Sequence, residues 1–288
     1  MKGFTIAGHV DQVINAEGEK VQLGGPPCFS SALGKTLGFP VEVATEIGYD
    51  FPDELVPMLR SLGIDCEKRS DLPMTRFVLD YRYEPRMMMV PTICGPIKLS
   101  QIQNSERLLL CPIAGEVSNE LIMDVDPSFL ALDPQGLLRN IKEDYTVEPC
   151  EWCNPNALEK IDLLKTSSNE HSLITGITDI RKSLKKLVKL GIDVAVITDG
   201  RNGSYVMTHS DFFRVPVYPV EVMDSTGAGD VFIAGLASHI DEGLEWASTV
   251  ASASSSAIVE TSGPEIKCDK TEILGRAELI YEKIEQLC

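Results

Sequence analysis

The clearest candidate for chemistry is a short segment in the last third of the chain. Residues 224–232 read Asp-Ser-Thr-Gly-Ala-Gly-Asp-Val-Phe and open an apolar run that extends to residue 240. Small residues at a helix start leave backbone N–H groups open to an anion, and the helix dipole favours negative charge there. An aspartate beside such a site repels phosphate, so Asp230 is best explained as a base for a substrate hydroxyl. Backbone amides of Gly227, Ala228 and Gly229 would then stabilise a transferring phosphoryl group.

Two other phosphate-binding glycine patterns do not match this chain. A dinucleotide fingerprint needs a small residue where Phe232 stands, and a P-loop needs a glycine where Phe29 stands. Taken from the residues alone, one alternative stays open, in which Asp224 and Asp230 only cap a helix.

The elements that must position this segment follow from the apolar pattern. Short apolar runs alternate with longer amphipathic ones, which predicts a parallel sheet covered on both faces, with ligands at the carboxyl ends of its strands. We expect strands at 4–10, 41–47, 108–113, 130–133, 161–165 and 194–198, and a strand-like stretch at 215–218. We expect helices at 28–37, 54–62, 180–190, 228–240, 244–259 and 271–286.

Two segments interrupt the alternation and read as strand pairs. They cover about 13–23, with a turn at 17–19, and about 75–96. They are predicted either to form a small β-sheet that acts as a lid over the strand ends or to be ordinary surface hairpins.

Composition limits the class of protein. The chain has 288 residues, 43% of them hydrophobic and 24% charged, which suits one large α/β domain. A net charge of −17 argues against nucleic acid or an anionic membrane as a general partner. No window approaches the roughly 20 apolar residues of a membrane span. The apolar stretch at the start of the chain is too short for the hydrophobic region of a signal sequence, so we expect a cytoplasmic location. Most of the cysteines should be reduced thiols. Cys150 and Cys153 have no second close pair of ligands, which favours a plain loop over a disulfide or metal site.

The segment 224–232, continued by Ile-Ala-Gly at 233–235, closely resembles the C-terminal signature of ribokinase-like (PfkB) carbohydrate kinases. Gly-Gly-Pro at 24–26, Glu-Ile-Gly-Tyr-Asp at 46–50 and the strand and turn at 196–203 resemble further parts of that family, so the likeness extends from residue 8 to 264. The resemblance implies a three-layer ribokinase-like α/β fold over residues 1–288, with a mainly parallel central sheet and a small β lid. Within that family, the chain most resembles archaeal members, including inositol kinase-like proteins.

The resemblance also implies the catalytic and donor sites. Asp230 would be the catalytic base, and Gly227, Ala228 and Gly229 the anion hole. Adenine would lie between the turn at 198–203 and the helix pair around 251–259, although the small residues at 252–257 equally suit close helix packing. The residues implied for ATP binding are Thr198, Gly200, Gly203, Thr226 and Ser256.

Metal sites are implied less completely. Glu170 matches the glutamate of the family's Asn-x-x-Glu motif, which organises magnesium, but Ser167 stands where the asparagine is expected. Magnesium keeps most of its waters, so the loss of one amide need not abolish binding. Asp224 matches a position that holds a monovalent cation in some members.

For the acceptor, the resemblance implies Asp11, Gly25, Gln135 and Arg139. The segments 112–117 and 133–139 resemble archaeal members, some of which phosphorylate inositol. A turn amide and a solvated cation remain the alternatives for Gln135 and Arg139. His9 is predicted to be a satisfied structural histidine and Arg86 a charge at the rim.

The resulting expectation is an ATP- and magnesium-dependent kinase that phosphorylates a hydroxyl of a small sugar or polyol. Two alternatives are a nucleoside kinase of the same family, in which Phe77 or Tyr81 would stack on a base, and a non-catalytic sugar-binding sensor. A homodimer formed through the lid is a further expectation from the resemblance.

Overall fold

The computed structural model describes residues 1–15, 21–80, 82 and 87–287. The turn expected at 17–19, Tyr81 and Arg86 lie outside the described residues.

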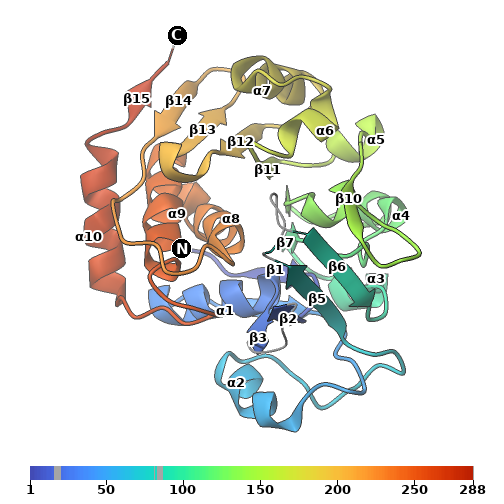
Figure 1. Ribbon diagram of the computed structural model, residues 1–288. Coiled ribbons are helices and arrows are strands. Elements are labelled where there is room, and N and C mark those ends of the chain that lie inside the picture. The colour runs from blue at the N-terminus through green and yellow to red at the C-terminus, as the bar shows by residue number, and fades with distance from the viewer. Residues whose placement is uncertain (16–20, 81, 83–86, 288) are drawn as a thin grey trace.

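A nine-stranded sheet forms the centre of the molecule (Figure 1). The six strands from β4 to β12 are parallel, and β13, β14 and β15 continue the sheet antiparallel. In spatial order the strands are β4 (Val41–Ala44), β1 (Phe4–Ala7), β7 (Arg107–Leu110), β8 (Phe129–Leu132), β11 (Leu163–Ser167), β12 (Val194–Thr198), β13 (Ser204–Met207), β14 (Phe212–Val215) and β15 (Glu285–Gln286).

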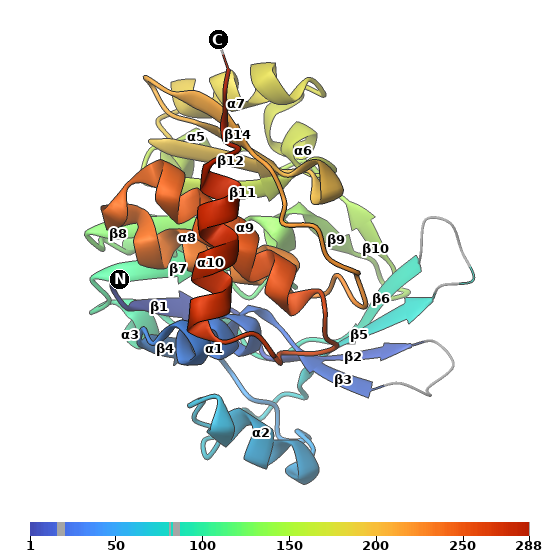
Figure 2. The same cartoon turned by 90° about the vertical axis from the view of Figure 1, so that its left-hand side faces the viewer.

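Helices cover both faces of this sheet and make three layers (Figures 1 and 2). One face carries α1 (Pro26–Leu37), α8 (Ala228–His239), α9 (Leu244–Ile258) and α10 (Lys270–Tyr281). The other carries α3 (Leu99–Ile102), α4 (Asn119–Asp124), α5 (Pro155–Leu158), α6 (His171–Thr175) and α7 (Ile180–Lys189). Both faces are buried, which explains why the parallel strands read as nearly continuous apolar runs.

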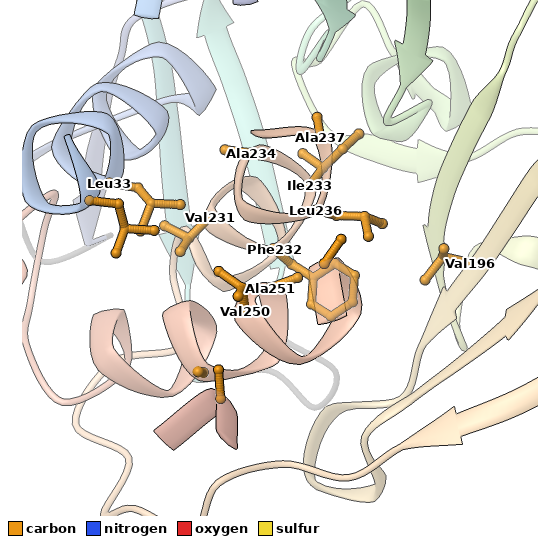
Figure 3. Close-up of a cluster of buried hydrophobic side chains, with 14 of the residues drawn as sticks. Leu33, Val196, Val231, Phe232, Ile233, Ala234, Leu236, Ala237, Val250 and Ala251 are labelled. Carbon is orange, nitrogen blue, oxygen red and sulfur yellow. The ribbon is translucent and has the colours of Figure 1, made fainter. Parts of the chain in front are cut away.

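Strand alternation divides the core between the two layers. On β7, Leu109 packs toward α8 and α9, whereas Leu108 and Leu110 pack toward α4 and α7, because successive side chains leave a strand on opposite faces. In Figure 3 the α8 side chains gather between Leu33 of α1, Val196 of β12 and the α9 residues Val250 and Ala251. This packing holds α8 against the sheet.

A second sheet of four strands, here called the small sheet, extends from one edge of the molecule (Figure 2). In order it contains β3 (Val21–Gly24), β2 (Asp11–Asn15), β5 (Thr75–Asp80) and β6 (Met87–Thr92). Phe77 and Val90 pack against Ile113 and Ala114 after β7. The small sheet is thereby anchored at the carboxyl ends of the central strands.

Two smaller units complete the chain. A two-stranded ribbon of β9 (Arg139–Ile141) and β10 (Val147–Pro149) touches β6 through a bridge between Met89 and Thr146. Between β4 and β5 in the chain, η1 (Asp53–Leu55) and α2 (Val56–Ser61) pack in a further apolar cluster that includes Leu23 of β3 and Cys28 of α1. No helix in the described part of the chain is long and apolar enough to cross a bilayer.

The structure corrects several predicted boundaries. The strand expected at 4–10 ends at Ala7, and β2 starts at Asp11 in the small sheet. The helix expected at 271–286 ends at Tyr281 and is followed by β15. The strand expected at 215–218 ends at Val215, since Pro216 has no N–H to continue the ladder. Strands β13 and β14 were not predicted as a pair.

Candidate active site

Two cavities meet at the first turn of α8. The larger has a volume of about 630 Å³ and lies between α9, the turn after β12 and the segment 217–222. The smaller, of about 200 Å³, lies between α8, the small sheet and the ends of β8 and β11. Ser225 and Gly229 line both cavities. The start of α8 therefore separates two binding volumes that share one wall.

The turn before α8 has a backbone that demands glycine. Gly227 caps the helix with a φ of 81°, and a Cβ there would lie 2.2 Å from the Phe29 ring of α1. Ahead of it, the Thr226 N–H donates to Asp224 Oδ1 at 3.0 Å. The first turn of a helix leaves N–H groups without intrahelical partners, so Gly229, at the junction of the cavities, lies where an anion could be bound.

Asp230 lies on the small-cavity side of this junction. Burial raises the pKa of Asp230 to about 7, with a further rise from the Asp133 carboxylate and opposing effects of Lys165 and Arg139. A carboxylate with a pKa near the working pH is suited to take up a proton and release it again. The predicted base therefore lies at the wall that the two cavities share.

Asp11 and Gly25 face the same small cavity from the small sheet and the start of α1. Asp11 is 6% exposed, and its Oδ1 has no hydrogen-bond partner in the described structure. Burial raises the pKa of Asp11 to about 8, and Asp230 adds to the rise. Gly25 has a φ of 90°, and a Cβ there would lie 2.1 Å from the His9 carbonyl oxygen. The two predicted acceptor residues are thus side by side at the cavity.

Gln135 and Arg139 line the cavity from the segment that follows β8. Gln135 begins the short helix η2 (Gln135–Leu138), and Arg139 follows it at the start of β9. Arg139 Nη1 donates to the Ile113 carbonyl at 2.8 Å, and its guanidinium lies 5.2 Å from the centroid of the Phe77 ring. These two contacts hold the Arg139 side chain in the lining of the cavity, so it is not a solvated cation.

Two charged residues of the cavity were not predicted as site residues. Asp133 follows β8, Lys165 lies within β11, and both are nearly fully buried. Lys165 Nζ donates to Asp133 Oδ2 at 2.6 Å. The signal in the sequence was a lysine in the middle of a strand of otherwise uncharged residues.

The residues expected at the nucleotide separate into two groups. Thr198, Gly200, Gly203 and Ser256 line the larger cavity, as does Ala228 of the expected anion hole. Thr226 lines the smaller one, beside Gly227. Tyr218 also lines the larger cavity, and the Arg276 guanidinium lies 4.9 Å from the centroid of its ring. The segment containing Tyr218 was predicted as a strand, so its contribution to this cavity was missed.

The residues expected at metals line neither cavity. Glu170 Oε2 accepts from Ser167 N at 3.1 Å and from Ser167 Oγ at 2.6 Å, so the serine orients this carboxylate. The charge of Glu170 contributes to the raised pKa of Lys165, which places it in electrostatic range of the small cavity. Asp224 Oδ2 accepts from Ser262 Oγ at 3.2 Å. Among the described residues, no three His, Cys, Asp or Glu side chains form a ready cluster for a metal.

Two other predicted features are structural. His9 is fully buried, with Nε2 2.7 Å from the Gly95 carbonyl and Nδ1 2.8 Å from Thr75 Oγ1. The carbonyl can only accept, so Nε2 carries the proton and Nδ1 accepts from the threonine. Cys150 and Cys153 are free thiols in the loop between β10 and α5.

A model of the pfkB family carbohydrate kinases matches residues 6–271 of the chain. The protein belongs to this family. It is 26% identical to a cytidine kinase of Thermococcus kodakarensis, over 84% of this chain and 90% of that protein. It is 31% identical to a fructokinase of Klebsiella pneumoniae over 38% of this chain and 34% of that protein.

Solved structures show the same fold. A pyrophosphate-dependent kinase of the ribokinase family, complexed with a pyrophosphate analogue and myo-inositol, superposes with a TM-score of 0.78 at 22% identity, covering 97% of this chain and all of that one. A ribokinase of Thermotoga maritima superposes with a TM-score of 0.72 at 20% identity, covering 96% and 99%. The expected ribokinase-like fold and the expected kinase activity of a pfkB member are confirmed.

Proposed function

We propose that this kinase transfers the γ-phosphoryl group of ATP to a hydroxyl of a small, uncharged sugar or polyol, with Asp230 as the general base. One observation carries the proposal: a donor-sized cavity and a smaller one meet at Gly229, and Asp230 lies on the side of the smaller one. In-line transfer needs a donor and an acceptor on the two sides of one phosphoryl group.

The larger cavity supports a nucleotide as donor. Its volume of about 630 Å³ lies in the range of small-molecule sites. Val217, Tyr218, Val220 and Val259 make much of its lining apolar, which suits a flat base. Its polar end is the first turn of α8, which suits phosphates.

Magnesium fits the electrostatics of the site through Glu170, whose carboxylate is oriented by Ser167. The ion would supply charge neutralisation of the phosphates. Asp224, with Ser262 beside it, is the proposed contact for a monovalent cation.

The charges of the smaller cavity favour an uncharged acceptor. Asp11, Asp133 and Asp230 line this cavity with the two cations Lys165 and Arg139. Above the pKa of Asp11, which burial raises to about 8, all three acids are carboxylates and outnumber the cations. A phosphorylated acceptor would meet net repulsion there. A polyol suits the site, because carboxylate oxygens and the Gln135 amide accept hydrogen bonds from hydroxyls.

In the proposed reaction Asp230 takes the proton of the acceptor hydroxyl as its oxygen bonds to the γ-phosphorus. The bond from that phosphorus to the β–γ bridging oxygen breaks, and ADP leaves. The backbone N–H groups around Gly227–Gly229 stabilise the negative charge on the phosphoryl group while it is transferred. The small sheet covers the acceptor side and acts as a lid that excludes water.

A nucleoside is the second candidate acceptor, favoured by the similarity to a cytidine kinase. Stacking on Phe77 does not support it, because this ring is 4% exposed and Arg139 already lies against it. A sensor without activity would not need a base at the junction of the cavities. A cytoplasmic location and a homodimer through the small sheet stay predictions.

The test is ADP release with Mg-ATP over inositols, pentoses, hexoses, sugar phosphates, deoxyketo acids and nucleosides, including cytidine. Asp230→Asn should bind ATP normally and lose on the order of 10²–10⁴-fold in kcat, whereas Asp124→Asn, on the exposed surface of α4, should match wild type. Near-normal turnover by Asp230→Asn would contradict the mechanism. ATP binding without turnover on any acceptor would favour the sensor.

A further inference from the structure

The ion pair between Lys165 and Asp133 lies where the phosphoryl group would pass. A Cβ placed on Gly229 would lie only 2.5 Å from Lys165 Nζ and 4.0 Å from Asp133 Oδ2. The ammonium therefore rests directly against the backbone of the anion site. Gly229 is the residue that leaves room for it.

Lys165 belongs to one cavity only. It lines the smaller cavity with Asp133 and Asp230, and it is not among the residues that line the larger one. A cation at this place would meet the terminal phosphoryl group at the acceptor side and would not reach the base or the ribose of a nucleotide.

The pair is not needed to join its two strands. β8 and β11 are already paired at Leu163 with Ala131 and at Leu164 with Leu132, next to the charged residues. Lys165 has one hydrogen-bond partner within the described structure, although an ammonium has three donors. Asp133 Oδ1 is buried and has no partner there. Both side chains thus keep unused hydrogen-bonding capacity at the cavity.

The charges around Gly229 explain why the Lys165–Asp133 ion pair would lie at this site. A phosphoryl group at Gly229 approaches the carboxylates of Asp230 and Asp133, which repel it. Burial opposes the charge of Lys165, but the carboxylates of Asp133 and Glu170 outweigh burial and raise its pKa, so the side chain stays an ammonium. It is the cation placed to offset the repulsion.

We propose that Lys165 is a catalytic residue whose ammonium binds the γ-phosphoryl group during transfer, and that Asp133 is its positioning residue. The inference rests on the proposed function, with ATP as the donor. Lys165 keeps its proton throughout: the acceptor proton goes to Asp230, the new bond joins acceptor oxygen to phosphorus, and the electron pair of the broken bond leaves with ADP. Lys165 adds a charged contact to the backbone amides.

The test compares Mg-ATP with Mg-ADP, which lacks the γ-phosphoryl group. Lys165→Met alone leaves Asp133 buried and unpaired and risks misfolding. The double variant Lys165→Met with Asp133→Asn removes both charges at nearly constant volume. Its matched control is Arg107→Met with Asp241→Asn, an ion pair at the start of β7, at the opposite ends of the strands. Affinities come from titration calorimetry, so the readout does not depend on knowing the acceptor.

The double variant should bind ATP at least about tenfold more weakly than wild type, while its affinity for ADP changes less than twofold. The control variant should bind both nucleotides as wild type does. Equal losses for ATP and ADP, or no loss for either, would overturn the role of Lys165 and leave the proposed function standing. A wild-type protein that binds neither nucleotide would overturn the proposed donor and this inference with it.

Discussion

At the scale of the residue, Asp230 is a carboxylate whose surroundings make it a base near neutral pH. Burial is the main cause of its raised pKa, and Asp133 adds to it. Lys165 and Arg139 limit the rise. The same three charges thus set the protonation state of Asp230 and line the cavity in which an acceptor would lie.

The pH dependence of kcat/KM should follow this value. The ionised form of Asp230 is required, and its fraction falls as pH decreases through about 7, so kcat/KM should fall tenfold per pH unit on the acid side. Asp133→Asn removes a negative neighbour and should move this limb to lower pH. A wild-type limb near pH 4, the ordinary value for an aspartate, would contradict the assignment.

At the scale of the element, helix α8 contacts α9 closely at two positions along its length. A Cβ on Gly235 would lie 3.1 Å from the Ala251 Cα of α9, so the two helices approach closely there. Nearer the site, Ser255 Oγ of α9 donates to the Ala228 carbonyl at 2.9 Å. The α9 small residues therefore serve close packing as well as lining the larger cavity.

Gly235→Val should separate α8 from α9 and lower the free energy of unfolding by about 1–3 kcal/mol. Because α8 carries Asp230, kcat should fall as well. Denaturant titration and steady-state kinetics measure the two effects. Gly275→Ala on α10 is the control, since nothing lies within 4 Å of its Cβ, and it should leave kcat unchanged and stabilise by up to about 1 kcal/mol. An equal response of the two variants would show that the helix contact is not decisive.

At the scale of the whole molecule, the smaller cavity, proposed for the acceptor, is shared between the two sheets. Val13, Phe77, Leu79 and Met88 of the small sheet line it opposite the strand ends of the central sheet. These apolar side chains offer no hydrogen bond to water. The smaller cavity, where we propose that the acceptor binds, is therefore completed by a part of the chain outside the three main layers.

Met88→Ala should open this cover. We expect a higher KM for the acceptor, an unchanged KM for ATP, and about a two- to tenfold larger ratio of ATP hydrolysis to acceptor phosphorylation, because water enters the site. Met123→Ala, at an exposed position of α4, is the matched control and should behave as wild type. Unchanged hydrolysis in Met88→Ala would contradict a water-excluding role of the small sheet.

Much of this protein was predictable from local patterns. The small residues at 227–229 predict the helix start that the structure has at Ala228, because cap geometry depends on neighbours in the chain. The apolar runs specify parallel strands buried on both faces, because burial favours one kind of residue throughout. The family resemblance followed from those same segments and was confirmed by the match over residues 6–271.

Only the tertiary structure placed the residues that are far apart in the chain. Lys165 and Asp133 are 32 positions apart and meet because β8 and β11 are neighbours in the sheet. β15 forms at the edge because β14 offers it a free ladder, which no local pattern reveals. Asp11 of the small sheet and Asp230 of α8 line the same cavity because the small sheet packs at the ends of the central strands. Such contacts, and the pKa shifts that follow from them, depend on which strands become neighbours, and that is decided by burial over the whole chain.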